Sequence, residues 1–396
     1  MIYKQFKELR LSTLGFGTMR LPWMADGSGT IDQDAVDKMI DYAMANGVNY
    51  YDTAYPYMNG LSELSVGKAL SRYPRDSWYL ADKFPGHQNV KGAIPLNFEA
   101  VFEDQLKKCG VEYFDFYLMH NVNEQSLPFY CGGDRAYMDY FLEQRRLGRI
   151  KHLGFSCHAD LPGLKKFIDM YGEHMEFCQI QLNYLDWSLQ GAKEKVEYLN
   201  SINMPVWVME PVRGGKLSKL DGDTEARMQA LRPGDSISSW AFRWLQTVPQ
   251  PTVVLSGMTL FLQVEDNVKT FSEEKPLSGE EIELVYSAAA KLEKLVPCTG
   301  CRYCCAGCPM ELDIPGLLNL HNDLLMDYNI NIVARYGAID QGKRADSCIA
   351  CGQCVEACPQ KINVPDILSE FAEKISRLDT WDSIAIKRNE IASKML

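Results

Sequence analysis

The sequence has no uninterrupted apolar run long enough to cross a bilayer, and residues 1–15 contain no apolar stretch of signal-peptide length. It also has no excess of positive charge, because 41 Lys and Arg face 52 Asp and Glu for a formal net charge of -11. An acidic surface does not attract nucleic acid or an anionic membrane. We therefore expect a cytoplasmic protein with neither nucleic acid nor a membrane as partner.

Without a secretory signal, the cysteines of this chain are not expected to form disulfides. There are 13 of them, and nine fall between Cys298 and Cys358, whereas four are scattered through the preceding region. Thiols stay reduced in the cytosol, where clustered cysteines are more often metal ligands than disulfide partners. The density near the end of the chain therefore predicts a metal centre.

The clustered cysteines form two runs with the same spacing, C-x2-C-x2-C-x3-C-P. Three thiolates at three-residue intervals wrap around one iron–sulfur cluster, and the cysteine before the proline ligates the other cluster. One [4Fe-4S] cluster would take Cys298, Cys301, Cys304 and Cys358, and the other would take Cys348, Cys351, Cys354 and Cys308. Zinc is the rival metal, but its sites favour paired C-x2-C ligands separated by a long gap. Cys305 is surplus to the motif.

The 39 residues between the two runs exceed what a compact ferredoxin hairpin needs. The segment from about residue 276 to about residue 375 resembles the helical two-cluster ferredoxin modules that relay electrons in larger oxidoreductases. This resemblance implies one-electron transfer, although clusters can also serve only as structural staples. Leu317, Leu320 and Leu324 repeat at helical spacing between the runs and predict a buried helix face.

From residue 10 to about residue 272, short apolar runs alternate with helical patterns, which indicates a parallel sheet covered by helices. The expected strands are residues 13–18, 48–54, 78–84, 114–120, 151–158, 177–184, 206–212 and 252–258. This rhythm predicts a (β/α)8 barrel. A doubly wound sheet is the alternative, but no GxGxxG follows the first strand. The character changes near residue 275, so we expect a barrel at 1–275 and a helical two-cluster domain at 276–396.

Catalytic side chains of such a barrel lie at the C-terminal ends of its strands. The second expected strand ends in YYDTAYPY, with Asp52 and Tyr57, the third ends in ADKF, with Lys83, and the fourth ends in LMHN, with His120. A phenol is too weak an acid at neutral pH unless a neighbouring ammonium stabilises its anion. A carboxylate can hold that ammonium, and an imidazole can bind a carbonyl oxygen. The constellation therefore predicts proton delivery to a carbonyl.

These segments, together with GFSCH and QIQLNY, resemble the aldo/keto reductase superfamily across about residues 1–272. The resemblance implies that Tyr57 is the general acid, that Lys83 and Asp52 tune it, and that His120 orients the substrate. It also implies a nicotinamide cofactor, NAD(P)(H), lying extended across the rim. Ser156 and Gln179 would hold its carboxamide, and Asp266 and Asn267 would reach the adenine end.

The sequence also departs from the family pattern. Met209 stands where an aromatic residue usually stacks on the nicotinamide, and Gly257, Met258 and Gln263 stand where basic residues and a serine are usual. A 2'-phosphate needs a cation, so strong NADP selectivity is not expected. Arg213 and Lys216 would supply charge from the opposite loop, or would be ordinary surface residues. The choice between NAD and NADP stays open.

Three functional hypotheses follow. The first is a redox enzyme acting on a small carbonyl or alcohol, with the two clusters linked to an electron partner such as a ferredoxin or flavoprotein. Since a hydride carries two electrons and a cluster one, this hypothesis needs a converter; the sequence shows no flavin motif, although many flavin sites leave none. The second is a conventional reductase with structural clusters. The third is a non-catalytic electron-transfer or binding subunit.

Overall fold

The computed structural model describes residues 1–88, 97–123, 126–133, 135–292, 295–326 and 330–378. The chain divides into two compact units, Met1–Ser287 and Ala288–Leu396. The division falls inside helix α12 (Gly279–Leu292), beyond the change of composition near residue 275. The start of α12 belongs with the first unit because Arg232 donates two hydrogen bonds to Glu281, at 2.6 and 2.8 Å.

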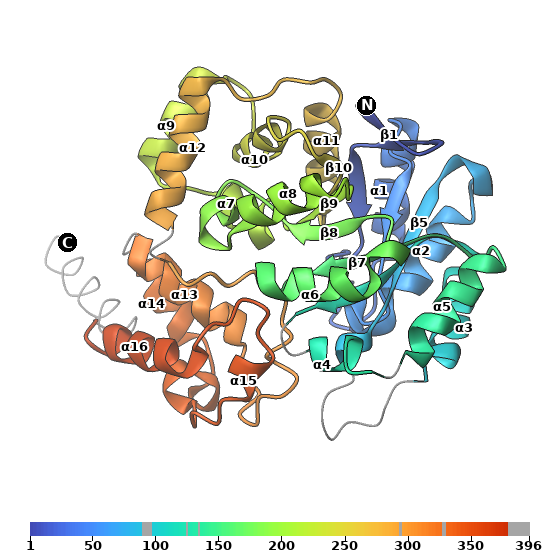
Figure 1. The fold of residues 1–396 in the computed structure, drawn as a ribbon. Coiled ribbons are helices and arrows are strands. Elements are labelled where there is room, and N and C mark those ends of the chain that lie inside the picture. Colours follow the sequence, from blue (N-terminus) through green and yellow to red (C-terminus); the bar gives the residue numbers. More distant parts are fainter. Residues whose placement is uncertain (89–96, 124–125, 134, 293–294, 327–329, 379–396) are drawn as a thin grey trace, which may run out of the picture. The chain divides into compact units, whose positions relative to one another are not determined.

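The first unit is a closed barrel of eight parallel strands in the order β10-β3-β4-β5-β6-β7-β8-β9 (Figure 1). The strands are β3 (Leu14–Gly17), β4 (Tyr50–Asp52), β5 (Tyr79–Phe84), β6 (Phe114–Val122), β7 (Ile150–Cys157), β8 (Cys178–Gln181), β9 (Val206–Met209) and β10 (Pro251–Gly257). Nearly all their residues are buried, as expected for a sheet covered on both faces. The predicted (β/α)8 barrel is therefore confirmed.

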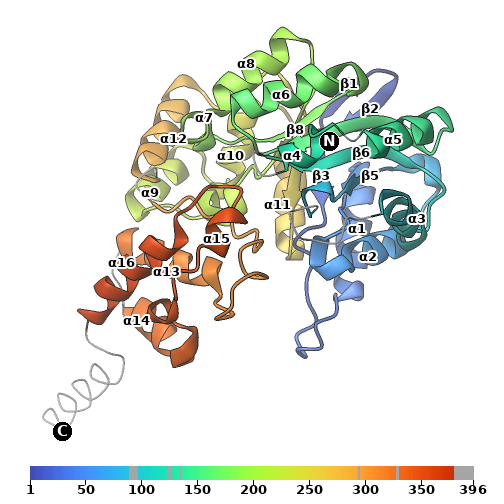
Figure 2. The same ribbon diagram turned by 60° about the horizontal axis from the view of Figure 1, so that its bottom comes forward.

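Helices connect the strands and cover the outside of the barrel (Figure 2). They are α1 (Gln33–Ala45), α2 (Ser62–Leu70), α3 (Phe98–Cys109), α4 (Leu127–Tyr130), α5 (Ala136–Arg146), α6 (Leu161–Tyr171), α7 (Asp186–Leu189), α8 (Ala192–Ser201), α9 (Gly222–Leu231), α10 (Ile237–Leu245), α11 (Phe261–Thr270) and α12. Side chains of Asp32, Asn97 and Asp160 cap α1, α3 and α6 by accepting a backbone N–H. Ser278 and Glu281 form a capping box at the start of α12.

A two-stranded hairpin that the sequence patterns did not indicate precedes the barrel. It pairs β1 (Tyr3–Phe6) with β2 (Leu9–Ser12) in antiparallel register. Phe6 packs against Phe116 and Trp207, whose ring centroids lie 5.8 and 5.0 Å away, near the beginnings of β6 and β9. The hairpin therefore closes the N-terminal end of the barrel and leaves the opposite end for chemistry.

The second unit is mainly helical and is built around the cysteine runs. Its helices are α13 (Ile314–Met326), α14 (Ile330–Gly337), α15 (Gln353–Glu356) and α16 (Val364–Ser376). Leu317 and Leu320 are buried and Leu324 packs against the same core, as their helical spacing predicts. None of the helices in the described part of the chain combines the length and apolarity that crossing a membrane requires.

Candidate functional site

The C-terminal ends of β4 and β5 bring Asp52 and Lys83 into direct contact. The Lys83 Nζ lies 2.5 Å from Asp52 Oδ1 and 2.6 Å from the carbonyl oxygen of Thr53. Lys83 is 0% and Asp52 3% exposed, so the pair is removed from solvent. Burial raises the pKa of Asp52, and the Lys83 ammonium opposes this rise. The predicted carboxylate–ammonium pair is present.

Tyr57 follows in a tight turn, in which Met58 and Asn59 have positive φ angles of 52° and 57°. Lys83 Nζ lies 4.9 Å from the centre of the Tyr57 ring. Burial, followed by the carboxylates of Asp52 and Glu210, raises the pKa of Tyr57 well above its ordinary value. This pKa is therefore raised and not lowered as expected, because burial and the two carboxylates outweigh the neighbouring Lys83 ammonium. The phenol keeps its proton at neutral pH and can donate it.

His120, at the end of β6, faces the same space. Its ring lies 5.7 Å from that of Tyr57, edge to face at 80°. The imidazole is 4% exposed, and its Nδ1 is buried without a hydrogen-bond partner. Burial, with the charges of His87 and Lys83, lowers the pKa of His120 well below its usual range, so the ring is neutral. A neutral imidazole can donate one N–H to a carbonyl oxygen.

The backbone around His120 is fixed by Tyr130 of α4. The Tyr130 hydroxyl donates to the His120 carbonyl oxygen over 2.6 Å. This approach requires a glycine at position 86, because a Cβ atom there would lie 2.6 Å from the Tyr130 ring. The sequence patterns did not single out Tyr130. The contact indicates that the loop after β6 helps to hold the imidazole in place.

Strands β7, β8 and β9 carry Ser156, Gln179 and Met209. Gln179 Nε2 lies 3.7 Å from Met209 Sδ, and Ser156 Oγ accepts the backbone N–H of Asn121 over 2.8 Å. The Gln179 Oε1 is buried and has no hydrogen-bond partner. A buried amide oxygen without a partner is costly unless a ligand supplies a donor. A primary carboxamide supplies such N–H groups, so these residues fit the nicotinamide head.

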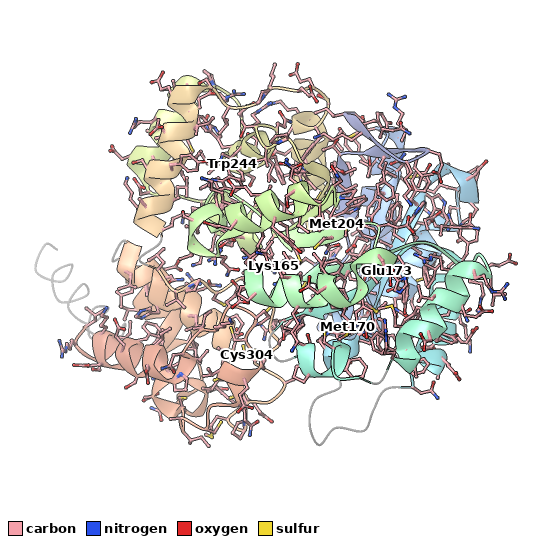
Figure 3. The ribbon with its side chains drawn as sticks, in the orientation of Figure 1. Lys165, Met170, Glu173, Met204, Trp244 and Cys304 are labelled. Carbon is pink, nitrogen blue, oxygen red and sulfur yellow. The ribbon has the colours of Figure 1, made fainter. Side chains whose placement is uncertain are left out.

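The cysteines of the second unit line two separate cavities, and each cavity combines both runs. The first cavity is lined by Cys298, Cys301, Cys304 and Cys358. The second cavity is lined by Cys308, Cys348, Cys351 and Cys354. Figure 3 labels Cys304, whose thiol lies inside this unit with 8% of the residue exposed. This arrangement matches the crossed ligand sets expected from the spacing of the runs.

The thiols surround these cavities and do not converge on one point. Within the described segments, no three His, Cys, Asp or Glu side chains are arranged to hold a single metal ion. A tetrahedral zinc site needs four ligands at about 2.0–2.3 Å from one centre. Four thiolates spread around a cavity suit the four corners of an iron–sulfur cube better. The residues therefore fit two [4Fe-4S] clusters.

Comparison with known proteins identifies both parts of the chain. The model of the aldo/keto reductase family matches residues 13–290, and that of the 4Fe-4S dicluster domain matches residues 297–362. The chain belongs to the aldo/keto reductase family. The family resemblance inferred from the sequence is thereby confirmed, and the protein is an oxidoreductase of this type with a 4Fe-4S dicluster domain.

Individual relatives of this aldo/keto reductase cover the barrel. An NADH-specific methylglyoxal reductase of Escherichia coli is 24% identical over 72% of this chain and 97% of its own. The holo form of aldo-keto reductase AKR11C1 from Bacillus halodurans is 25% identical, with a TM-score of 0.57 over 73% of this chain and 96% of its own. An aldo/keto reductase from Klebsiella pneumoniae in complex with NADP and acetate is 20% identical, with a TM-score of 0.57 over 72% of this chain and 94% of its own.

Three predicted nucleotide contacts of this aldo/keto reductase already have protein partners. The Arg213 guanidinium is 2% exposed, and its Nε lies 2.9 Å from Asp186 Oδ1. Asp266 accepts a hydrogen bond from Ser236, and Asn267 donates one to Ser256 Oγ over 2.9 Å. Because Asp186 already balances the charge of Arg213, the structure argues against Arg213 as a phosphate ligand. Asp266 and Asn267 remain predictions.

Two further aromatic residues stand next to the site residues in the sequence, Tyr55 before Tyr57 and Phe84 after Lys83. Phe84 is fully buried and stacks on Tyr137, and Tyr55 lies beneath the Lys108 ammonium, 4.3 Å from its ring centre. Sequence reasoning missed His87, whose ring lies 4.7 Å from that of His120. It also missed Glu210, whose Oε1 lies 4.0 Å from Nη2 of Arg20. Their positions next to strand ends were the available signal: His87 four residues after Lys83, and Glu210 directly after β9.

Proposed function

We propose that this aldo/keto reductase reduces a small aldehyde or ketone with a nicotinamide nucleotide, and that its second unit binds two [4Fe-4S] clusters that exchange single electrons. The observation that carries the barrel chemistry is the convergence of Tyr57, Lys83, Asp52 and His120. Two of these residues present buried polar atoms without partners, Asp52 Oδ2 and His120 Nδ1. In a barrel without catalytic activity, burying these atoms without hydrogen-bond partners would cost free energy and serve no function.

Each residue of the site has a definite task in this proposal. The neutral His120 imidazole donates an N–H to the substrate oxygen and orients it toward Tyr57. The Tyr57 hydroxyl, which keeps its proton because its pKa is raised, gives that proton to the oxygen as negative charge develops there. Lys83 lies over the Tyr57 ring and stabilises the resulting phenolate. The Gln179 amide holds a carboxamide, and a nicotinamide bound there would supply the hydride.

We further infer a preference for NADH. The beginning of α11, where the resemblance would place the adenine end, presents apolar side chains: Leu260, Phe261 and Leu262 are 58%, 40% and 73% exposed. Arg213, which was expected to supply charge from the opposite loop, is already paired with Asp186. None of the three apolar side chains offers a positive charge to a 2'-phosphate, although Lys38 lines the same cavity as Leu260 and Phe261. The NADH specificity named for the Escherichia coli relative supports the same choice.

The direct test is anaerobic purification, followed by assay of NADH oxidation with methylglyoxal and other small aldehydes. Tyr57→Phe should lower kcat by about 10²- to 10⁴-fold, the usual contribution of a general acid. Tyr55→Phe is the matched control, because this tyrosine stands in the same loop but lies beneath Lys108. Wild-type turnover that survives in Tyr57→Phe would contradict the proposal, as would the absence of any NAD(P)H-dependent reduction.

The electron-transfer part needs its own measurement. Iron and sulfide analysis should give about eight irons per chain, and flavin and nucleotide analysis of the same sample tests for a bound two-electron to one-electron converter. A reductase with structural clusters is the second candidate. Cys351→Ser, folded to the same extent, should retain NADH-dependent carbonyl reduction if the clusters are only structural, and should lose coupling to one-electron acceptors if they relay electrons.

A further inference from the structure

The two cysteine runs have the same spacing, so each serves as an internal reference for the other. In the first run, the residue after the leading cysteine is Thr299, which is 5% exposed. In the second run, the equivalent residue is Ile349, which is 60% exposed. The usual order is thus reversed, with the polar side chain inside and the apolar side chain in solvent. Nothing in the motif requires an exposed isoleucine, so its exposure distinguishes the second run from the first.

The difference extends to the ligands. Ile349, Ala350 and Cys351 are exposed in succession, whereas the equivalent residues of the first run are buried or half-buried. The cavity bounded by Cys308, Cys348, Cys351 and Cys354 is also lined by Ile349, Pro309 and Met310, with Pro309 exposed and Met310 half-buried. Electron transfer weakens steeply with distance, so a carrier gains most by approaching a ligand at the surface. The second cavity provides that approach.

The two cavities also differ in the charge of the residues around them. The exposed carboxylates of Asp346 and Glu356 stand two residues before Cys348 and two residues after Cys354. Within the described residues, neither takes part in an ion pair, whereas nearby Lys343 pairs with Glu311 at 2.5 Å. The nearby Arg344 guanidinium donates to the carbonyl oxygens of Ile339 and Gly337. These carbonyl oxygens leave the charge of Arg344 in place, so Asp346 and Glu356 exceed it by one negative charge and the surface around the second cavity is weakly acidic.

The chain around the first cavity carries Arg302, directly after Cys301, and Lys361, three residues after Cys358; both are exposed, and Arg302 pairs with Asp313 at 2.8 Å. The charge beside the first cavity is therefore less negative than the charge beside the second. A negatively charged rim around an apolar centre favours a partner with a basic rim and an apolar centre, because opposite potentials steer the encounter and suppress other partners. The formal net charge of -11 on the whole chain acts in the same direction.

We infer that residues Ile349–Cys351 form the docking site of a one-electron carrier protein with a basic surface, which exchanges electrons with the cluster held by Cys308, Cys348, Cys351 and Cys354. This inference rests on the proposed cluster content. One electron leaves the reduced cluster, and the oxidised carrier gains it. The carrier would not approach the other cluster directly, because its ligands Cys298, Cys301, Cys304 and Cys358 are buried or half-buried.

The test uses the dithionite-reduced full-length protein with its clusters, mixed anaerobically with a small charged oxidant while cluster absorbance is followed. Ile349→Asp should speed oxidation by cationic tris(phenanthroline)cobalt(III) about threefold at low salt, and slow oxidation by anionic hexacyanoferrate(III) about threefold. Ile349→Lys should do the reverse. The matched controls are Leu325→Asp and Leu325→Lys, at an aliphatic residue of α13 that is 40% exposed and lines neither cavity. They should change neither rate.

A second measurement addresses the carrier itself. With cytochrome c as a basic one-electron carrier, the bimolecular rate constant should fall severalfold in the double variant Asp346→Asn, Glu356→Gln, and the fall should vanish at high salt. Equal responses at Ile349 and Leu325 would overturn the docking site, as would a larger response to Arg302→Gln, which removes a charge beside the first cavity. Iron content, measured first, separates these results from a failure to bind clusters.

Discussion

The buried pair of Asp52 and Lys83 offers the sharpest quantitative test of the barrel site. At 2.5 Å, two unit charges in a medium with an effective dielectric constant of about 20 attract by about 7 kcal/mol. Desolvation of two fully buried ions opposes most of this gain. Removing one partner leaves the desolvation cost without the attraction. Asp52→Asn should therefore destabilise the barrel by about 3–5 kcal/mol.

The reverse change should behave differently. In Lys83→Met the remaining Asp52 carboxyl can take up a proton, since burial already raises its pKa. Protonating a group with an ordinary pKa of about 3.9 costs at most about 4 kcal/mol at pH 7, and this cost falls by about 1.4 kcal/mol for each pH unit toward acid. The double variant Asp52→Asn, Lys83→Met removes both charges and should be more stable than Asp52→Asn alone by about 2 kcal/mol.

The assay is urea unfolding followed by tryptophan fluorescence. Six of the seven tryptophans precede residue 250, so the signal reports the barrel. Trp244, which Figure 3 labels, is one of them. Its indole Nε1 donates to the Tyr286 hydroxyl over 3.3 Å. A cost below about 1 kcal/mol for Asp52→Asn, or a Lys83→Met cost independent of pH, would refute the reasoning, because it would mean that the pair is hydrated in solution.

Three further predictions rest on separate contacts. Because the pKa of Tyr57 is raised and that of His120 is lowered, kcat for carbonyl reduction should stay level between about pH 6 and about pH 9. A loss of activity centred near pH 7 would contradict a protonated Tyr57 and a neutral His120. Arg232 holds the pKa of Glu281 at about 2, so Arg232→Gln should cost about 1–2 kcal/mol of barrel stability at pH 7. This loss of stability should be fully present above about pH 4.3 and should shrink as the pH falls through about 2. Urea unfolding of both proteins at several pH values measures it. Asn322 binds both backbone polar groups of Val296 at 2.8 and 2.9 Å just before Cys298, so Asn322→Leu should speed iron release to a chelator from about half of the iron, and unchanged release would argue against this support.

Much of the barrel could be read from the sequence because its signals are local. Apolar strands alternate with capped helices, and the end of each strand is marked by the residues that follow it. Asp52, Lys83 and His120 could be placed together since parallel strands share one edge. The hairpin of β1 and β2 escaped notice because its strands are four residues long and its burial depends on distant partners such as Trp207.

The electrostatics of the site could not be derived in this way. Whether Lys83 acts mainly on Tyr57 or on Asp52 depends on distances of a few ångströms between strands. Likewise, Arg213 and Lys216 stand close together in sequence, yet only the folded chain shows that Arg213 is buried against Asp186. The cysteine runs are the opposite case, since their spacing alone predicted which thiols would share a cavity.

That exchange of ligands between the runs has a consequence for biosynthesis. Cys358, the last thiol of the first cavity, leaves the ribosome only after the whole second run has been made. The proposed cluster of the second cavity would therefore gain its fourth ligand only with Cys354, and that of the first cavity only with Cys358, whatever the supply of iron and sulfide. Truncation anywhere between the runs would leave three thiols for the first cavity and one for the second, so that neither site could be completed.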